Sequence, residues 1–526
     1  MEQIDLIRRN TIGDILRKNA RRYADKTAVT YYLDGGKKSL TYKELNDAAN
    51  RFANSLAEFG INKGDVAALM SHNCMQFIVA AWGFIKAGVT ATYINVNFVP
   101  HEVAYQINHS DAKILFTEDS LLDIVLKVKN ELKGIERFGY INIKNEPVPD
   151  GWLNLEELYS DKYSSEEPKV DIANDDIALR MYTSGTTAFP KGIDLTYSNV
   201  EYKAHCVAGS TGNGMEVDSV VGFFIPLYHG GLLMMYGCHA IGAHFVVGTL
   251  SNLPNTLNII EKEKVSWTLF PVTIFNRLVN SPDAKDKLSS LKEAEWFGGA
   301  MPLDVLQKVL EMLPNLTLIP QWSQTECLIG TLTRLNKNTP LPKAGNIIGK
   351  PYLDTEIKIV DEDDNEVPDG EFGEIVLRSP VVMKRYYKNE EATKNAFRNG
   401  WHHTGDMAYK GDDGFYYFVD RVKDMIKTGG VNVSAVEVEQ VLNNIDGIEM
   451  SAVFGVYHPD WAEAVVAAVV SKNENLTEKN VISICKNQLA NFKVPKRVIF
   501  VNSIPLSHVG KILRKNLRET YKDLFE

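Results

Sequence analysis

The densest group of chemically capable residues lies at positions 182–192, which read YTSGTTAFPKG. Glycines let backbone N–H groups turn toward an anion, serine and threonine hydroxyls add donors, and a lysine adds positive charge. The segment therefore predicts a phosphate-binding loop, although its spacing does not fit G-x-x-x-x-G-K-[ST]. A polar surface turn is the alternative. The candidate ligands are Thr183, Ser184, Gly185, Thr186, Thr187 and Lys191.

A second group consists of the sequence WHHTGD at positions 401–406 together with Arg421, which lies fifteen residues after Asp406. A carboxylate only accepts hydrogen bonds, so one carboxylate can take both hydroxyls of a vicinal diol, as in a ribose. Gly405 and Asp406 also suit an ordinary turn, and Arg421 alone would suit a surface ion pair.

The third group is a basic run near the C-terminus, which contains no acidic residue between positions 486 and 518. A lysine on a loop can swing into a site and neutralise phosphate charge, and Lys511 follows Gly510 in such a segment. A solvated basic face is the plainer interpretation. Nucleic-acid binding is weaker, because only Phe492 and Phe500 interleave as aromatics. The basic residues are Lys486, Lys493, Lys496, Arg497, Lys511, Arg514, Lys515 and Arg518.

Alternating helical and strand patterns must position these groups. Residues 44–59 repeat apolar positions as a helix does, and residues 66–70 read as a strand. A helix at 77–86 stops at Gly88, before a strand at 90–94. This alternation predicts an α/β fold with mainly parallel sheets flanked by helices.

The chain has 526 residues, too many for one compact core. A strand at 414–419 is followed by a charged segment, which predicts a boundary near Asp420. We expect a large N-terminal domain over residues 1–419 and a hinge at 420–423. Residues 424–526 are enough for a small, mobile α+β domain.

Composition excludes several classes of protein. Hydrophobic residues make up 44% of the chain and charged residues 24%, which rules out a disordered or collagenous chain. A net charge of −10 argues against nucleic-acid binding through bulk charge. The five cysteines are widely spaced and form no CxxC, so neither a zinc site nor a disulfide framework is expected.

The cysteines and the N-terminal residues indicate the cellular compartment of the protein. Unpaired cysteines fit a reducing compartment, and the first residues lack the basic and apolar regions of a secretory signal. We therefore expect a cytoplasmic protein. The apolar residues 220–238 include Pro226, His229 and four glycines, which favours a buried strand, loop and helix over a membrane span. Peripheral contact with a membrane is left open.

Taken in order, six motifs resemble the adenylate-forming superfamily of acyl-CoA synthetases, luciferases and peptide-synthetase adenylation domains. The resemblance covers nearly the whole chain. Residues 182–192 are similar to YTSGTTGxPKG with Ala188 in place of glycine, residues 298–300 read GGA, and residues 321–326 are similar to YGxTE. Residues 226–231 resemble PLFHxxG, and residues 505–511 keep the Gly-Lys that closes PRTxxGK.

The resemblance implies a role for each matching position. Thr325 would touch the α-phosphate of ATP, and Thr187 and Glu326 would hold magnesium. Asp406 and Arg421 would bind ribose, and His229 would gate the acyl pocket. Lys423 would be the hinge and Lys511 the catalytic lysine. The nucleotide wall would comprise Gly299, Ala300, Gln321 and Trp322, and the pantetheine tunnel Gly429 and Gly430.

The implied reaction is a two-step ligation of an acid to a thiol. A carboxylate attacks the α-phosphate of ATP, and CoA then takes the acyl group, with Mg²⁺ assisting. We expect a medium- or long-chain fatty acid or a carnitine-type acid, with aryl acids such as cinnamate or benzoate second. No lysine or arginine that could pair with a second carboxylate lies in positions 220–249, which disfavours dicarboxylic acids.

Three alternatives stay open at this point. A stand-alone adenylation enzyme would load a carrier protein, and a luciferase-like oxidase would share the same motifs. A degenerate homologue would only bind nucleotide, although the retained Lys511, Asp406, Arg421 and Glu326 argue against it. We expect no nucleic-acid partner, and the sequence leaves the oligomeric state open.

Overall fold

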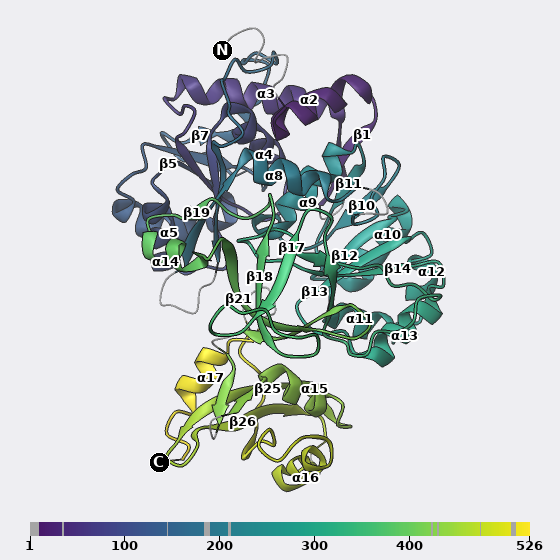
Figure 1. Ribbon diagram of the computed structural model, residues 1–526. Coiled ribbons are helices and arrows are strands. Elements are labelled where there is room, and N and C mark those ends of the chain that lie inside the picture. Colours follow the sequence, from purple (N-terminus) through teal and green to yellow (C-terminus); the bar gives the residue numbers. More distant parts are fainter. Residues whose placement is uncertain are drawn as a thin grey trace.

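The computed structural model describes residues 10–33, 36–144, 146–183, 190–208, 212–421, 424–428, 431–473, 475–506 and 512–525. Within them, helices and strands alternate as expected and build a large N-terminal domain with two sheets and a smaller C-terminal domain (Figure 1).

The first sheet has eight strands among the described residues, in the order β19-β9-β8-β4-β3-β5-β6-β7. It is parallel from β8 to β7, and β9 and β19 add antiparallel strands at one edge. The strands are β3 (Val66–Met70), β4 (Thr90–Tyr93), β5 (Ala112–Glu118), β6 (Arg137–Ile141), β7 (Leu153–Asn154), β8 (Ile177–Thr183), β9 (Lys191–Thr196) and β19 (Arg385–Tyr386).

The helices beside this sheet confirm the sequence pattern. α3 (Tyr42–Glu58) and α4 (Met75–Ala87) begin and end within two residues of the expected bounds, and Gly88 closes α4 at φ +71°. All thirteen residues of α4 are buried, which explains why its apolar residues do not form a single stripe. At Gly83 a Cβ would lie 2.3 Å from Phe52 Cδ1, so this glycine lets α3 and α4 approach closely.

The second sheet has fourteen strands among the described residues and is mixed. Its strands β14, β13, β12, β10, β11 and β1 are parallel, and antiparallel strands extend both ends. At the start of the antiparallel arm, the short connection from β14 to β15 suits an antiparallel pair, because parallel neighbours need a longer crossover. Its strands are β17 (Glu356–Val360), β18 (Gly373–Arg378), β21 (Trp401–Lys410), β22 (Tyr416–Arg421), β16 (Ile347–Pro351), β15 (Thr331–Leu332), β14 (Thr317–Trp322), β13 (Glu293–Phe297), β12 (Trp267–Pro271), β10 (Val220–Phe223), β11 (His244–Val247), β1 (Thr27–Leu33), β2 (Gly36–Thr41) and β20 (Phe397–Arg398).

Helices pack on both faces of these sheets (Figure 1). The remaining helices of the large domain are α2 (Ile12–Arg22), α5 (Pro100–Ser110), α6 (Leu122–Val128), α7 (Leu155–Leu158), α8 (Tyr197–His205), α9 (Leu232–Ala240), α10 (Leu253–Glu263), α11 (Val272–Leu278), α12 (Ala284–Lys287), α13 (Leu303–Met312) and α14 (Glu390–Ala396), with short turns at Asp119–Leu121, Lys129–Glu131 and Leu227–Gly231. Residues 220–238 form the expected strand, loop and helix, namely β10, the turn Leu227–Gly231 and most of α9.

The C-terminal domain is α+β and lies below the large domain in Figure 1. Its sheet has the order β24-β23-β26-β25, with β27 beside β26. The elements are β23 (Ile426–Thr428), β24 (Val431–Val433), α15 (Ala435–Asn443), β25 (Ile448–His458), β26 (Ala462–Ser471), α16 (Glu478–Gln488), β27 (Arg497–Phe500) and α17 (Arg514–Thr520). Asp420 and Arg421 belong to β22 of the large sheet, and the proposed hinge at 420–423 stays a prediction.

Acidic residues of the C-terminal domain pair with much of the basic run. Arg514 Nη2 lies 2.7 Å from Glu439 Oε2, and both side chains are largely buried. Lys493 pairs with Glu437, at 2.6 Å. Two further pairs are Arg497–Glu478 and Arg518–Asp424. These contacts favour the plainer interpretation of the run for the four residues concerned.

All five cysteines are buried, free thiols. Burial raises the pKa of Cys74 to about 12 and that of Cys485 to about 11. No helix in the described part of the chain is both long and apolar enough to cross a membrane.

Candidate active site

Several predicted site residues meet at one edge of the large sheet. Gly298–Ala300 directly follow β13, Gln321 and Trp322 end the neighbouring strand β14, and His229 follows β10. Because the carboxyl ends of parallel strands share an edge, these residues lie where ligands of open α/β sheets bind. Gly298 has φ +86°, and nothing lies within 4 Å of a Cβ built on it or on Gly299. This edge is therefore open at the predicted nucleotide wall.

Asp406 is held from the end of β14. Trp322 Nε1 donates to Asp406 Oδ2 at 2.9 Å, and Gln324 Nε2 donates to the same oxygen at 2.7 Å. The Trp322 indole is buried against Gly330, where a Cβ would lie 2.2 Å from Cζ3. Trp322 thus orients the carboxylate, and its contact with a nucleotide base stays a prediction. Sequence reasoning missed Gln324, which occupies the variable position of the 321–326 motif.

The two predicted ribose-binding residues are neighbours. β21 and β22 are antiparallel, and their register pairs Asp406 with Arg421. Arg421 Nε lies 3.7 Å from Asp406 Oδ1. The fifteen-residue spacing therefore reflects a hairpin that brings a buried carboxylate and a partly exposed guanidinium together.

We expect Asp406→Asn to raise the KM for ATP by about tenfold or more. The asparagine oxygen can still accept hydrogen bonds from Trp322 and Gln324. An amide NH₂ replaces the oxygen that faces Arg421, however, and the side chain no longer carries the negative charge that favours ribose hydroxyls. The measurement is pyrophosphate release against ATP concentration. Asp369→Asn is the control, because Asp369 is exposed and pairs with Lys410, which lies on the same strand as Asp406. An unchanged KM in Asp406→Asn would remove Asp406 from the nucleotide site.

Glu326 is the candidate metal ligand. Tyr386 donates to its Oε1 at 3.0 Å, and its backbone oxygen accepts from the Met383 N–H at 2.8 Å. Burial raises the pKa of Glu326, although the hydrogen bond from Tyr386 opposes this. Among the described residues no lysine or arginine forms a salt bridge with Glu326, and a carboxylate of this kind suits Mg²⁺, which binds one or two carboxylates together with substrate phosphates. Thr325 directly precedes it and is half-buried.

The described residues contain no group of three His, Cys, Asp or Glu that could hold a metal by itself.

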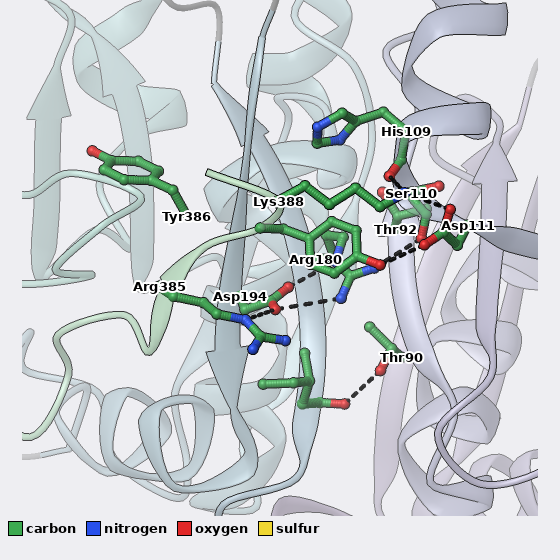
Figure 2. A network of polar contacts seen from close by, with 12 residues as sticks. Thr90, Thr92, His109, Ser110, Asp111, Arg180, Asp194, Arg385, Tyr386 and Lys388 are labelled. Carbon is green, nitrogen blue, oxygen red and sulfur yellow. Dashed lines mark hydrogen bonds and ion pairs between the residues drawn. The ribbon is translucent and has the colours of Figure 1, made fainter. Parts of the chain in front are cut away.

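A buried ion-pair network supports the β8–β9 hairpin, which flanks the predicted phosphate segment. Asp194 on β9 is fully buried and lies between Arg180 on β8 and Arg385 on β19 (Figure 2). Arg180 Nε lies 2.7 Å from Asp194 Oδ1, and Arg385 Nε lies 2.9 Å from Oδ2. The Arg180 guanidinium also lies 3.2 Å from the centre of the Tyr387 ring. These contacts fix residues 383–388, here called the strap, against the hairpin.

The strap also connects the hairpin to Glu326. Figure 2 shows Tyr386 pointing away from the Asp194 network. Its hydroxyl reaches Glu326, and Lys191 Nζ lies 4.8 Å from the centre of its ring. One residue thus touches both the predicted phosphate lysine and the predicted metal ligand. No motif pointed to Tyr386 or Asp194, because both act through partners distant in sequence.

Part of the predicted site lies outside the described residues. Thr183 and Lys191 face each other in the ladder of the β8–β9 hairpin. Leu506 and Ile512 form a bridge on either side of residues 507–511. The predicted residues outside the described ranges are Ser184, Gly185, Thr186, Thr187, Lys423, Gly429, Gly430 and Lys511.

His229 lies in the turn Leu227–Gly231 between β10 and α9, and its ring centre is 4.7 Å from that of Tyr228. Apolar residues on both sides of the turn are buried in the core between the two sheets: Phe223, Leu232, Leu233, Met234 and Met235. Such residues suit an apolar pocket wall as well as a plain core.

Comparison with known proteins identifies the class. The AMP-binding enzyme family matches residues 16–387, and the AMP-binding enzyme C-terminal domain matches residues 437–511. The chain therefore belongs to the AMP-binding enzyme family. It is an AMP-forming acyl-CoA ligase that works through an acyl-adenylate, and ATP and CoA are its substrates.

The names of similar proteins specify different acid substrates. A long-chain-fatty-acid–CoA ligase of Escherichia coli O6:H1 is 31% identical over 98% of this chain and 96% of its own. A 2-succinylbenzoate–CoA ligase of Bacillus licheniformis is 30% identical over 95% and 98%. The crystal structure of the anthranilate CoA ligase AuaEII with anthranoyl-AMP has a TM-score of 0.87 and 25% identity, covering 98% of both chains.

Proposed function

We propose that this ligase activates an aliphatic acid, either a medium- or long-chain fatty acid or a carnitine-type acid. The observation that carries the proposal is the buried apolar wall on both sides of the His229 turn, at the open carboxyl edge of the sheet. The long-chain-fatty-acid–CoA ligases among the relatives support it.

In the proposed first step the carboxylate of the acid attacks the α-phosphate of ATP, which breaks the bond to the β-phosphate, forms the acyl-adenylate and releases pyrophosphate. Both reactants are anions, so neutralising charge supplies most of the rate enhancement. Lys511, Lys191 and the hydroxyls of residues 183–187 face the phosphates, while Asp406 and Arg421 hold the ribose. Glu326 and Thr187 would hold Mg²⁺, which supplies charge neutralisation when bound. Tyr386 orients Glu326 through its 3.0 Å hydrogen bond.

In the proposed second step the thiol of CoA attacks the acyl carbonyl of the adenylate, which forms the thioester and releases AMP. The C-terminal domain rotates about Lys423, which withdraws Lys511 and brings Gly429 and Gly430 to line the pantetheine tunnel. His229 gates the acyl pocket in both steps.

An aryl acid is the second candidate. The 2-succinylbenzoate and anthranilate ligases match this chain at nearly the same identity as the fatty-acid ligases, and a flat apolar slot uses the same residue types.

The deciding experiment is acid-dependent pyrophosphate release with and without CoA. The acids are fatty acids of graded length, carnitine, cinnamate and benzoate. We expect release with one acid class, and CoA should yield the matching thioester. Release that CoA cannot complete would contradict the proposed acceptor and point to a carrier protein. Activity with only the aryl acids would replace the first candidate by the second.

A further inference from the structure

A cluster of polar side chains is buried between the two sheets of the large domain. It comprises Lys203 on α8, Glu295 on β13 and Asn213, which are 3%, 5% and 0% exposed. Asn213 Nδ2 donates to Glu295 Oε2 at 2.5 Å and to Gln321 Oε1 at 3.1 Å. None of the three residues belongs to a motif, and the mechanism above uses none of them.

The cluster lies on the face of β13 that packs toward α8, α9 and the His229 turn. Side chains alternate along a strand, and Ala294 and Trp296 pack into the core on one side of β13. Glu295 therefore shares the opposite face with Phe297, which packs against the core that contains α8, α9 and the His229 turn. Figure 1 shows α8 and α9 in the middle of the large domain. Glu295 on β13 thus precedes the GGA segment, and Asn213 contacts Gln321.

Two polar atoms of the cluster lack partners. Lys203 Nζ and Asn213 Oδ1 are buried and make no hydrogen bond with the described residues. An unpaired donor or acceptor in such a place destabilises the folded state, and a charged group does so more strongly. Burial lowers the pKa of Lys203, and the nearby carboxylate of Glu295 opposes this shift. Packing alone does not explain why these groups are kept here.

The missing partners define the chemistry of a ligand. Lys203 Nζ needs an acceptor, and Asn213 Oδ1 needs a donor. A cation would be repelled by Lys203, and a second carboxylate would have to share Lys203 with Glu295, whose pKa burial already raises to about 7. A neutral group with both a donor and an acceptor satisfies the whole cluster.

We propose that Lys203, Asn213 and Glu295 bind a hydroxyl or carboxamide group on the distal part of the acid. This inference rests on the proposed function, because it takes the face beneath Gly298 to be the acyl side. It narrows the substrate to acids with a neutral polar group. Unsubstituted long chains would leave the cluster unpaired, and carnitine carries a permanent cation beside its hydroxyl.

The test compares acids that differ by one hydroxyl. The pairs are hexanoate and 6-hydroxyhexanoate, octanoate and 8-hydroxyoctanoate, and cinnamate and 4-hydroxycinnamate. For at least one pair, the wild-type kcat/KM for pyrophosphate release should be at least about tenfold higher with the hydroxyl, because a site built to bind a hydroxyl rejects the analogue that lacks it. Equal or better use of the plain acid in every pair would overturn the inference but leave the proposed function intact.

Variants of the cluster test whether the preference for hydroxylated acids depends on these residues. Lys203→Met should lower the hydroxyl-to-plain ratio at least about tenfold, and Glu295→Gln should also lower it. Glu293→Gln is the matched control, because Glu293 lies on the same face of β13 and pairs with Arg334. A general folding defect lowers both rates and leaves their ratio unchanged. A ratio unchanged in Lys203→Met would refute the role of the cluster, and silence toward all six acids would count against the inference and the proposed function together.

Discussion

Replacing Lys511 with alanine is expected to reduce formation of the acyl-adenylate by at least about a hundredfold while sparing thioester formation from a supplied acyl-adenylate. In the proposed mechanism Lys511 neutralises charge on the phosphates only during the first step, and removing one such group from a transition state costs about a hundredfold to a thousandfold. The measurement compares acid-dependent pyrophosphate release with thioester yield from synthetic acyl-adenylate and CoA.

Lys515→Ala is the control for this experiment. Lys515 lies on α17, is 57% exposed and faces Glu519, so its loss should change neither half-reaction. Equal loss of both half-reactions in Lys511→Ala would refute the division of labour. Loss of the second half-reaction alone would reverse it.

The second large effect is expected at Asp194, which carries the network between hairpin and strap. Asp194→Asn leaves Arg180 buried without a counter-charge, and breaking a buried pair in this way costs about 3–5 kcal/mol. The strap also carries Tyr386 and hence Glu326. We therefore expect a large fall in the free energy of unfolding, measured with urea, and at least about a tenfold slower pyrophosphate release under folding conditions.

A double variant separates charge from packing in this network. Arg180→Met with Asp194→Leu removes both buried charges, and such apolar replacements of buried pairs are often neutral or stabilising. Arg385 is half-exposed and can turn to water. The double variant should therefore recover most of the lost stability. Lys384→Ala is the control in the strap, since its pair with Asp175 is exposed and worth at most about 1 kcal/mol. If the double variant is no more stable than Asp194→Asn, the network acts through its shape and not its charge.

Local patterns predicted several helices and strands of the large domain. The apolar repeat of α3 and the glycine that ends α4 follow from backbone chemistry near in sequence, and the structure has both. The spacing of Asp406 and Arg421 likewise reflects one hairpin. The family resemblance is confirmed, while the roles of individual site residues stay predictions.

Long-range partners could not be predicted from the sequence. Tyr386 meets Glu326 across 60 positions, and Arg385 meets Asp194 across 191. Which of many Tyr or Arg side chains fills such a position depends on the tertiary packing of separate strands, and a single sequence gives no local sign of it. The expectation of mainly parallel sheets also missed the antiparallel arm, where β16 pairs with β22, a strand distant in sequence.

The buried thiols have a consequence for chemical fidelity. An acyl-adenylate is an activated electrophile, and the thiolate is the form of cysteine that attacks it. Because all five cysteines are buried and burial raises the pKa of each, the protein offers this intermediate no competing nucleophilic sulfur. The acyl group is thereby not diverted to a cysteine of the enzyme before an incoming thiol arrives.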